Sequence, residues 1–590
     1  MHGFYQRGLR IDLSSQTSET FALDEALLGE TWGGKGLATR LLLEETPAGL
    51  DPLGPENCLI FTTGPVTGSA IWGSSRYGVF TKSPQTGFYS ESYSGGKAPE
   101  YISSAGYDAV LLTGVAQSPV WIEISDDQVW FHPADDLWGL DSYATEDAVK
   151  AKVRAARDQD SGVVVIGPAG ENLVRFAVIE NDYWRSAGRT GVGTVMGSKR
   201  VKAMAFWGNQ KRSIADPDQL KQFAAAIARK AKEDKGVQNY KKCGTSQLVD
   251  LLNEVGGFPS RYWQTGRVAH RDGINCAALH SRCEVKPHAC AKCLMACGRL
   301  ATVLHGPHAG LTVEGPEYET IFAFGGLCEI QDIEDIVYLN DLCDRLGMDT
   351  ISAGNLAGLA IEASRRSRIP LQLDYGDVQG VAELLTDIAA MRGHGAVLGL
   401  GVKHAARVWE MEDVVVHVKG LEPAGYDPRA LKGMGLAYAT SDRGACHLRA
   451  TFYKPELAGM VDPRNSTGKG AVFRVWEDRL TFFDMLILCR FYRDMYQWEE
   501  LRAICQATTG RFLDVDEMIR MASNVADDTR RFNIREGLCR EDDRLPVHLT
   551  SRPLPETGYA ISAQEVDAMV DEYYAARGWK GEDGVPGEKS

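Results

Sequence analysis

The chain has 590 residues, of which 44% are hydrophobic and 24% are charged, and its formal net charge is −15 at pH 7. This length predicts about two to four domains, and this composition excludes a mostly disordered chain. The negative net charge argues against nucleic acid or an anionic membrane as a partner of the whole molecule. An acidic surface of this kind can still carry a local basic patch for an acidic partner.

No stretch approaches the roughly 18 uninterrupted apolar residues of a transmembrane helix, and the first residues contain no apolar signal-peptide core. We therefore expect a cytoplasmic protein that does not insert into membranes. The 13 cysteines are scattered along a long chain. Their distribution favours reduced thiols and a metal site over a disulfide framework.

Short apolar runs bounded by turn residues fill the first third of the sequence. They include residues 58–64 (CLIFTTG), 109–114 (AVLLTG), 162–167 (GVVVIG) and 203–208 (AMAFWG). Runs of this length with turn residues at their ends are typical of β-strands. The sequence therefore predicts a strand-rich N-terminal region joined by glycine-rich loops.

Helical patterns take over after residue 211. Asp216 followed by Pro217 is a typical helix start, and apolar residues then recur at helical spacing over 220–227. Residues 411–425 interrupt the later helices with a predicted strand and proline-rich turns.

The predicted fold class is α+β, with three domains. A β-rich N-terminal domain spans residues 1–210. A mainly helical domain that contains a cysteine triplet spans 211–415, and a second mainly helical domain spans 416–590.

The cysteine triplet lies in the segment CAKCLMACGR, where two and then three residues separate Cys290, Cys293 and Cys297. Thiolates at this spacing suit a [4Fe–4S] cluster that takes its fourth ligand from a remote cysteine. A structural zinc site completed by Cys283 or His288, or a set of unrelated buried cysteines, are the alternatives. Candidates for the remote cluster ligand are Cys283, Cys328, Cys343, Cys446, Cys489 and Cys505.

Two glycine-rich loops stand near arginines in the first domain. One contains Gly95 and Gly96, and the other runs from 188 to 197, with Arg185 and Arg189 at or beside its start. Glycine lets backbone N–H groups approach phosphate oxygens, and arginine adds bidentate positive charge. The glycine spacing fits neither a dinucleotide fingerprint nor a Walker loop. The loops favour an anionic cofactor without saying which one, although single glycines are more often plain turns.

Acid–base candidates occur in two segments. EGPEYET places Glu314, Glu317 and Glu319 close together, and RGACHLRA contains His447. Carboxylate and imidazole are the usual proton-transfer groups of enzymes. Each of them taken alone is also compatible with a solvated loop charge or a hydrogen-bonded core histidine.

Taken together, these segments resemble the tungsten-containing aldehyde:ferredoxin oxidoreductase family over nearly the whole chain. The resemblance implies one tungsten, with molybdenum as the alternative, held by the dithiolene sulfurs of two pterins in the β-rich domain. It also implies Mg²⁺ between the pterin phosphates and a [4Fe–4S] cluster beside one pterin. The segments that carry the likeness include GGKGLATRLLL, RYGVFTKSPQTGF, SGGKAPE, AGRTGVGTVMGSKRVKA, CAKCLMACGR, EGPEYET, CDRLGMDTIS and YDPRALKGMGLAYATSDRGACH.

The resemblance assigns the cluster to Cys290, Cys293, Cys297 and Cys489. Cys489 ends DMLILC, which is similar to the family motif D-x-x-G-L-C, and Ile487 stands where the family has glycine. The companion motif of the family is DRLGMD at 344–349.

The same resemblance implies contacts to the pterin cofactor. Tyr93 stands where the family has asparagine, and Arg449 where it has lysine. The implied contacts are Arg76, Tyr93, Ser94, Gly95, Gly96, Arg185, Ser186, Ala187, Gly188, Arg189, Asp344, Gly347, Met348, Asp349, Arg449, Asp484 and Leu488.

Glu319 and His447 match the polar residues beside the metal in aldehyde-oxidising members. The implied reaction oxidises an aldehyde to a carboxylic acid with water as the oxygen source. Its electrons would leave through the cluster to ferredoxin or to a partner iron–sulfur subunit. Residues 338–341 (YLND) lack the E-x-x-H pair that some family dimers use for a shared metal. We expect no such metal, and both homo- and hetero-oligomers remain open.

Two other functions compete with aldehyde oxidation. One is the catalytic subunit of a low-potential aromatic acyl-CoA reductase of the same superfamily, and the other is an iron–sulfur electron-transfer subunit without catalysis. The EGPEYE segment together with Glu319 and His447 favours aldehyde oxidation. The presence of both pterin motifs argues against a subunit that has lost its metal–pterin site.

Overall fold

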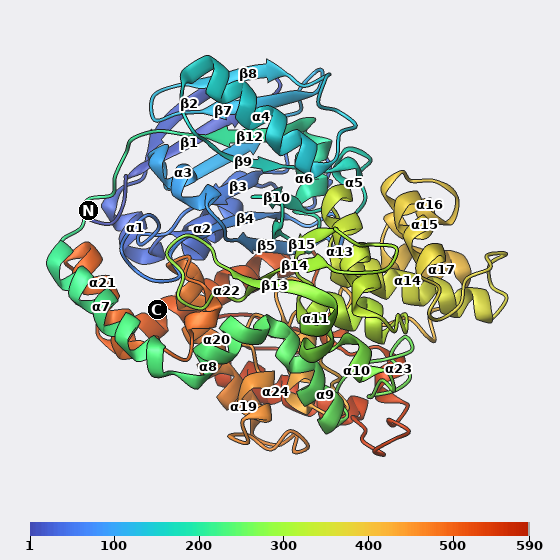
Figure 1. Cartoon of the computed structure of the whole chain (residues 1–590). Helices are drawn as coiled ribbons and strands as arrows, with labels where there is room; N and C mark the ends of the chain where they lie inside the picture. The colour runs from blue at the N-terminus through green and yellow to red at the C-terminus, as the bar shows by residue number, and fades with distance from the viewer. Residues whose placement is uncertain (588–590) are drawn as a thin grey trace.

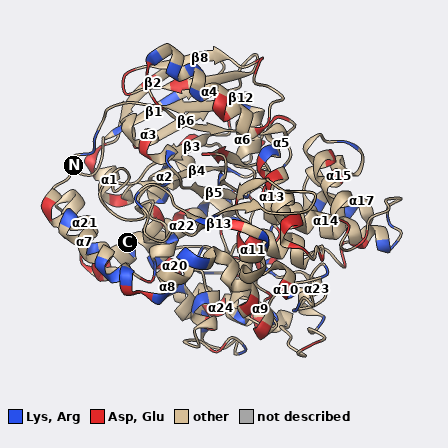
Figure 2. Cartoon of the chain, viewed as in Figure 1, with Lys and Arg blue, Asp and Glu red and all other residues tan. Residues whose placement is uncertain are grey.

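The computed structural model describes residues 1–587, and its two large β-sheets lie in the N-terminal part (Figure 1). The strands of these sheets fall within 7–206, and the remainder is mainly helical apart from one three-stranded sheet. Acidic and basic residues are interspersed over both parts (Figure 2). The α+β class with a β-rich N-terminal region is confirmed, whereas the division of the helical part into two domains stays a prediction.

The first sheet has six strands in the order β2-β1-β6-β3-β4-β5. β1 and β6 are parallel, and the other neighbours are antiparallel. The strands are β1 (Arg7–Asp12), β2 (Thr17–Ala22), β3 (Leu59–Thr62), β4 (Tyr77–Lys82), β5 (Tyr89–Ser94) and β6 (Ala109–Thr113).

The second sheet has the order β11-β10-β9-β12-β7-β8, with β12 and β7 parallel. Its strands are β7 (Val120–Ile124), β8 (Val129–Pro133), β9 (Gly162–Val165), β10 (Ile179–Asn181), β11 (Arg185–Ala187) and β12 (Val201–Phe206). β3, β6, β9 and β12 coincide with the four apolar runs from which strands were predicted.

The two sheets share one apolar core. Phe61 from β3 and Ile122 and Met204 from the second sheet are fully buried in it. The alternate residues of β3, such as Ile60, face the other way, toward Leu37 on α2 (Gly34–Glu45). The first sheet is therefore buried on both faces, which explains why LIFT is apolar throughout rather than alternating.

Six helices accompany the sheets. α2 packs against β3 and β4 and also against α20 and α22 of the C-terminal region, so it joins the two halves of the molecule. The other helices of this part are α1 (Glu25–Thr31), α3 (Ala98–Ser104), α4 (Ser142–Arg157), α5 (Pro168–Glu171) and α6 (Val192–Ser198).

The helical part begins with α7 (Pro217–Glu233), at the predicted start. The Asp216 carboxylate accepts the Gln219 backbone N–H, and Pro217 occupies the first turn, so the sequence signal is confirmed. Three short strands and a π-helical segment, η2 (Ile321–Gly326), accompany the helices up to α17. These elements are α8 (Lys235–Cys243), α9 (Leu248–Val255), α10 (Arg271–Ile274), α11 (Cys276–Arg282), β13 (Cys283–His288), β14 (Gly298–Val303), β15 (Thr312–Glu314), α12 (Tyr318–Thr320), α13 (Ile333–Leu346), α14 (Thr350–Arg365), α15 (Val378–Ala389), α16 (Gly393–Gly399) and α17 (Val402–Trp409).

The C-terminal region contains the remaining helices, and α20 packs against both α22 and α24. They are α18 (Lys432–Thr440), α19 (Tyr453–Leu457), α20 (Lys469–Met485), α21 (Trp498–Thr509), α22 (Val515–Arg535), α23 (Val547–Thr550) and α24 (Ala563–Arg577). Over residues 1–587 we find no helix that combines the length and the apolar character needed to cross a bilayer.

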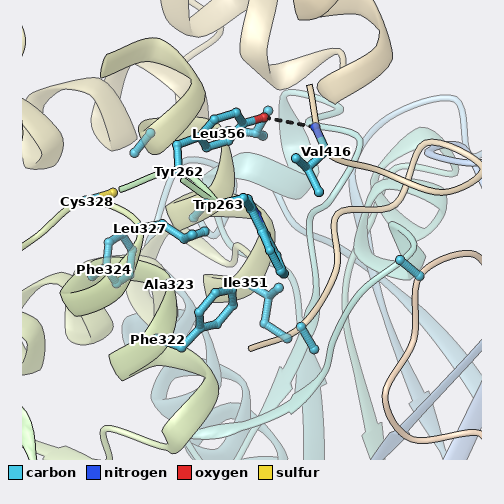
Figure 3. Packing of buried hydrophobic residues seen from close by; sticks show 14 of the residues in the cluster. Tyr262, Trp263, Phe322, Ala323, Phe324, Leu327, Cys328, Ile351, Leu356 and Val416 are labelled. Atoms are coloured by element: carbon cyan, nitrogen blue, oxygen red, sulfur yellow. Dashed lines mark hydrogen bonds between the residues drawn. The ribbon is translucent and has the colours of Figure 1, made fainter. Parts of the chain in front are cut away.

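The strand predicted within 411–425 does not form. Apart from Glu412 and Asp413 the segment is largely buried, but it consists of turns and irregular backbone, with one isolated bridge between Val418 and Leu421. Within residues 1–587 no strand pairs with it, and the Val416 N–H donates instead to the Tyr262 hydroxyl at 3.3 Å (Figure 3). The prediction was wrong because a short apolar run such as 414–416 signals burial, whereas a strand also needs a neighbour for its backbone hydrogen bonds.

One pair of cysteines departs from the expected reduced state. Cys243, at the end of α8, and Cys276, at the start of α11, form a disulfide, and eleven cysteines are free. The expectation of reduced thiols is therefore wrong at this pair. A single bridge is still far from a disulfide framework, because most of the molecule is held by its apolar cores.

Two glycines that were considered for a phosphate loop instead allow close packing of α6. A Cβ on Gly193 would lie 2.2 Å from the Val178 carbonyl oxygen, and one on Gly197 would lie 2.0 Å from the Gly170 carbonyl oxygen. α6 therefore packs directly against the backbone of α5, at Gly170, and against the backbone of Val178, just before β10. Close packing of this helix therefore accounts for glycine at 193 and 197.

This contact predicts that Gly197→Ala destabilises the protein by about 1–3 kcal/mol, as overpacking of a core does. An exposed helical glycine would show the opposite sign, since alanine favours helix by about 1 kcal/mol. Urea unfolding of both the variant and Ser198→Ala, a neighbouring control on the same helix, measures the difference. A Gly197→Ala protein at least as stable as the wild type would contradict the packing argument.

Candidate functional site

A cavity of about 400 Å³ lies where the N-terminal sheets meet the helical part, and most of the predicted site residues line it. Its walls come from β5, β11 and the segment between α13 and α14. The loop of the cysteine triplet (290–297), which we call the triplet loop, and two C-terminal loops (443–449 and 488–493) complete them. The predicted residues that line it are Arg76, Tyr93, Ser94, Gly95, Arg185, Ser186, Gly188, Arg189, Cys290, Cys293, Cys297, Glu319, Asp344, Met348, Asp349, His447, Arg449, Asp484, Leu488 and Cys489.

Three predicted cofactor contacts lie outside this lining. Ala187 is buried in the core between the sheets. Gly96 has φ +101° and Gly347 has φ +75°, so both occupy the backbone region that glycine tolerates best. Gly347 ends α13, where a Cβ would lie 2.7 Å from the Gly167 nitrogen. These residues shape the loops that carry their neighbours.

The four cysteines of the predicted cluster come together from two segments. The Cys489 N–H donates to the Gly73 carbonyl at 2.9 Å, and the Gly73 N–H donates to the Lys292 carbonyl at 2.8 Å. Tyr492 donates to Cys293 Sγ at 3.7 Å. Residue 73 thus bridges the Cys489 segment to the triplet loop.

The other candidates for the remote ligand lie elsewhere. Cys283, Cys328 and Cys343 are buried in the main helical core, and Cys505 is a buried residue of α21. Cys446 accepts hydrogen bonds from the Arg443 guanidinium, with Nη2 3.0 Å from Sγ.

A single zinc ion does not suit this arrangement. Among residues 1–587, no three His, Cys, Asp or Glu side chains converge closely enough to hold one metal ion. An iron–sulfur cubane holds its thiolates at separate corners, and so accepts a wider arrangement of sulfurs than tetrahedral zinc does. His288, the other candidate zinc ligand, contacts Glu314 instead, with Nδ1 2.8 Å from Oε2.

Arg76 connects the cysteines to the first glycine-rich loop. Its Nη1 lies 4.0 Å from Cys489 Sγ, and its Nη2 donates to the Tyr93 carbonyl at 3.2 Å. The loop passes so close to the triplet that a Cβ on Gly95 would lie 2.8 Å from Cys290 Sγ. Gly95 is therefore required for space at this point.

A buried ion network forms the wall behind Tyr93. Arg449 pairs with Glu91 on β5 and, at 3.2 Å, with Asp484 near the end of α20. Lys35 on α2 pairs with Glu91 at 2.9 Å. Burial alone would raise the pKa of Glu91, but Arg449 and Lys35 outweigh it and lower this pKa.

The second predicted loop faces the triplet through Arg185. Arg185 pairs with Glu314, the first glutamate of EGPEYET. The Ser186 hydroxyl donates to Glu180 at 2.8 Å. Burial raises the pKa of Glu180 to about 8, so this carboxyl binds a proton readily near neutral pH.

The residues of DRLGMD place further carboxyl groups on the cavity wall. Burial, followed by the nearby Glu180, raises the pKa of Asp344, and the Asn340 amide donates to Asp344 at 2.7 Å. The Asp349 carboxylate caps α14 by accepting the Ser352 N–H at 2.9 Å. Arg189 Nε lies 3.6 Å from Asp349 Oδ2 and joins this wall to the second loop.

Glu319 and His447 face each other, with His447 Nε2 3.5 Å from Glu319 Oε1. The Gly425 N–H donates to the other oxygen of Glu319 at 2.9 Å. Burial raises the pKa of Glu319 to about 7. Burial, followed by the positive charge of Arg189, lowers the pKa of His447 well below its usual value, so the imidazole is neutral at pH 7.

The lining of the cavity fits an anionic, phosphate-bearing cofactor. Nε and Nη2 of Arg449 are buried and have no hydrogen-bond partner. Buried donors without partners are costly, and phosphate oxygens are the acceptors that arginine matches best. The carboxyl groups opposite, including Glu317 and Glu319, have raised pKa values because they are buried. The interior is therefore more positive than a count of charged residues suggests.

Several cavity residues escaped the sequence reasoning. Arg443 and Arg490 line the cavity near predicted residues, and Arg490 donates to Asp484 at 3.1 Å. Tyr426 stacks on His447, with ring centroids 5.6 Å apart, and on Tyr453, at 4.1 Å. The arginines were detectable as charges within three residues of Cys446 and Cys489, whereas the tyrosines carried no signal that distinguished them from core residues.

The two parts of the chain match one protein family. The profile of the aldehyde ferredoxin oxidoreductase N-terminal domain matches residues 8–208, and that of aldehyde ferredoxin oxidoreductase domains 2 and 3 matches residues 222–590. These matches define the class of the protein as an oxidoreductase enzyme. The chain belongs to the aldehyde ferredoxin oxidoreductase family, which confirms the resemblance seen in the sequence and implies tungsten–pterin and iron–sulfur cofactors in general.

Individual relatives extend over the full length. The tungsten-containing aldehyde ferredoxin oxidoreductase of Thermococcus kodakarensis is 34% identical over 611 residues, which cover 100% of this chain and 98% of the relative. An aliphatic sulfonate oxidoreductase, WOR-like subunit, of Pyrococcus furiosus is 27% identical and covers 100% of this chain and 96% of its own. The solved active-site complex BamBC of benzoyl coenzyme A reductase has a TM-score of 0.82 at 21% identity, over 99% of this chain and 96% of that one, and shows the shared fold.

Ile487 stands where the family motif D-x-x-G-L-C has glycine. Its backbone is left-handed, with φ +54°. Its side chain is buried and fills the space beside Gly34, Gly64 and Gly78. A β-branched residue in this backbone region costs about 1–2 kcal/mol. Burial of its side chain, whose truncation to alanine typically costs about 2–5 kcal/mol, outweighs that strain.

The strain at residue 487 predicts that a glycine variant is more stable than an alanine variant, although glycine usually destabilises a protein more than alanine does. Both Ile487→Ala and Ile487→Gly lose the buried side chain, but only glycine relieves the left-handed backbone. We expect both to be less stable than the wild type, with the glycine variant more stable than the alanine variant by about 1 kcal/mol. Urea unfolding midpoints measure the order, and an alanine variant more stable than the glycine variant would contradict the argument.

Proposed function

We propose that this protein oxidises aldehydes to carboxylic acids, with water as the oxygen source, and passes the electrons to an iron–sulfur protein. The observation that carries the proposal is the pairing of Glu319 with His447 in the same cavity as the four cysteines. The names and full-length similarity of the tungsten-containing relatives support the same reaction. We place this activity in the cytoplasm.

The cofactors follow from the family and from the lining of the cavity. We propose that Cys290, Cys293, Cys297 and Cys489 hold a [4Fe–4S] cluster. The arginines and loop backbones of the cavity would hold the phosphates of two pterins, bridged by Mg²⁺. The bound tungsten or molybdenum centre would supply the two-electron oxidation, and the cluster would pass electrons on singly.

His447 positions the substrate in this proposal. Because its pKa is low, the ring is neutral and donates one N–H. With the proton on Nε2, which faces Glu319, this N–H can donate to the carbonyl oxygen of an aldehyde in the cavity. Its stacking on Tyr426 fixes the ring plane. The aldehyde is thereby oriented and polarised without a charged imidazole.

Glu319 moves the proton. Its Oε2 is held by the Gly425 N–H, and its Oε1 has no hydrogen-bond partner. Oε1 is therefore free to accept a proton from water or from an aldehyde hydrate. A pKa of about 7 suits this role, since a base works best when its pKa lies near the working pH.

This assignment predicts a pH dependence. The base must be ionised, so kcat/KM for aldehyde should rise with pH and level off above about pH 7. Glu319→Gln keeps the shape of the side chain and removes the base, so we expect a loss of about 10²–10⁴-fold and no rise across this range. Aldehyde-dependent reduction of benzyl viologen under anaerobic conditions measures both quantities.

The exposed Glu412→Gln serves as the control for Glu319→Gln, and equal tungsten and iron contents show that the variants are loaded. His447→Ala should lose activity with the same metal content. If loaded Glu319→Gln and His447→Ala proteins both turn over like the wild type, the assigned roles are wrong.

The cluster assignment predicts that Cys489→Ala loses iron. A thiolate ligand is removed, so iron per chain should fall well below the roughly four atoms of an intact cluster. Cys283→Ala, which alters a buried core cysteine, should keep its iron. Iron retained in Cys489→Ala but lost from Cys283→Ala would show that the remote ligand is misassigned.

The reductase alternative makes a different prediction for the same assay. A benzoyl-type thioester, rather than an aldehyde, would then turn over with the dye. A subunit without catalysis would turn over neither. The paired Glu319 and His447, and a cavity much larger than a cluster needs, favour aldehyde oxidation over both.

A further inference from the structure

A basic surface lies on two helices of this acidic protein. We call it the α7–α8 basic surface, and both helices carry several Lys and Arg in Figure 2. Within residues 229–242, only Glu233 and Asp234 are acidic. All of its cations except Lys241 are exposed, and in the described chain none forms an ion pair, whereas the nearby Lys221 pairs with Asp218. The surface consists of Arg229, Lys230, Lys232, Lys235, Lys241 and Lys242.

The end of α8 rests on the cysteine triplet. Arg299 donates both to the Lys241 carbonyl and to the Ala296 carbonyl, so it ties the helix to the triplet loop. A Cβ on Gly244, the residue after α8, would lie 2.5 Å from the Cys297 carbonyl oxygen. The end of α8, which carries part of the basic surface, is therefore packed directly against the loop that carries the cysteines.

α7 reaches the same centre through Trp72. The Trp72 indole donates to the Ala224 carbonyl at 2.8 Å, and the next residue, Gly73, bonds to both cysteine segments. On the outer side of α7, Ala225 and Ala226 are exposed beside the cations. Small side chains flanked by unpaired charges give a partner protein a flat surface to approach.

We propose that the α7–α8 basic surface docks an acidic, one-electron iron–sulfur carrier protein. Unpaired cations attract an acidic partner, and the negative charge of the remaining surface orients it toward this face. The inference rests on the proposed function and adds the place and the charge of the electron acceptor. Oxidation of one aldehyde by one water yields a carboxylic acid, two protons and two electrons, and two oxidised carriers each take one electron.

The test compares two acceptors on the loaded enzyme. The variant Lys232→Glu/Lys235→Glu reverses two charges of the surface. With a purified acidic ferredoxin as the probe, its KM for ferredoxin should rise about tenfold at low salt and lose most of its salt dependence. Its aldehyde-dependent rate with benzyl viologen should be unchanged, since the small dye needs no docking surface.

A matched control reverses two exposed cations elsewhere. Lys403 and Arg407 lie on α17, which Figure 1 shows on the opposite side of the molecule from α7. Lys403→Glu/Arg407→Glu changes the net charge by the same amount and should leave the KM for ferredoxin near the wild-type value. A similar rise in both variants would mean that net charge, not this surface, sets the affinity, and would overturn the proposal.

Carbodiimide cross-linking tests docking independently of aldehyde turnover. It joins lysines to carboxylates in contact, and mass spectrometry should place the bonds to ferredoxin at lysines within 230–242. Bonds that map mainly to other lysines would overturn the proposal. Failure of the proposed function would appear differently, as loaded protein that does not reduce the dye with any aldehyde, and the cross-linking result would still decide the docking site.

Discussion

The buried pairing of Arg449 with Glu91 and Asp484 is the contact on which the site depends. Arg449 comes from the C-terminal loops, Glu91 from β5 of the first sheet and Asp484 from α20. Buried ions are costly unless they are paired, so these side chains hold the two halves of the molecule in one arrangement. In this arrangement Nε and Nη2 of Arg449 are buried without a hydrogen-bond partner. The same pairing thus joins the halves and prepares the interior for an anion.

Charge in this interior is biased toward the positive. Arginines stay protonated when buried, whereas burial raises the pKa of carboxyl groups such as Glu317, Glu319 and Asp344. The phosphates of the proposed pterin cofactor would meet fixed cations there and few fully charged carboxylates. Glu319, with a pKa of about 7, can exchange a proton within that environment. One physical effect, desolvation, would therefore support both the proposed cofactor binding and the proposed proton transfer.

Secondary-structure elements that short patterns determine could be predicted from the sequence. Contacts between residues far apart in the chain could not. The strands at β3 and β12 and the start of α7 follow from short patterns that local backbone and burial preferences decide. The choice of Cys489 needed a family motif, because nothing local separates it from Cys505. Residues 411–425 were misassigned, since their burial comes from the surrounding helices and not from a sheet. Tyr426 was missed because only the folded chain stacks it on His447.

The metal content of the anaerobically purified protein tests the central claim most directly. In the proposed enzyme, one cavity would contain a tungsten or molybdenum bis-pterin centre next to a four-cysteine cluster. Elemental analysis should then give about four iron atoms and about one atom of tungsten or molybdenum per chain. Zinc in place of iron, or iron with neither tungsten nor molybdenum in protein from cells supplied with both metals, would contradict it.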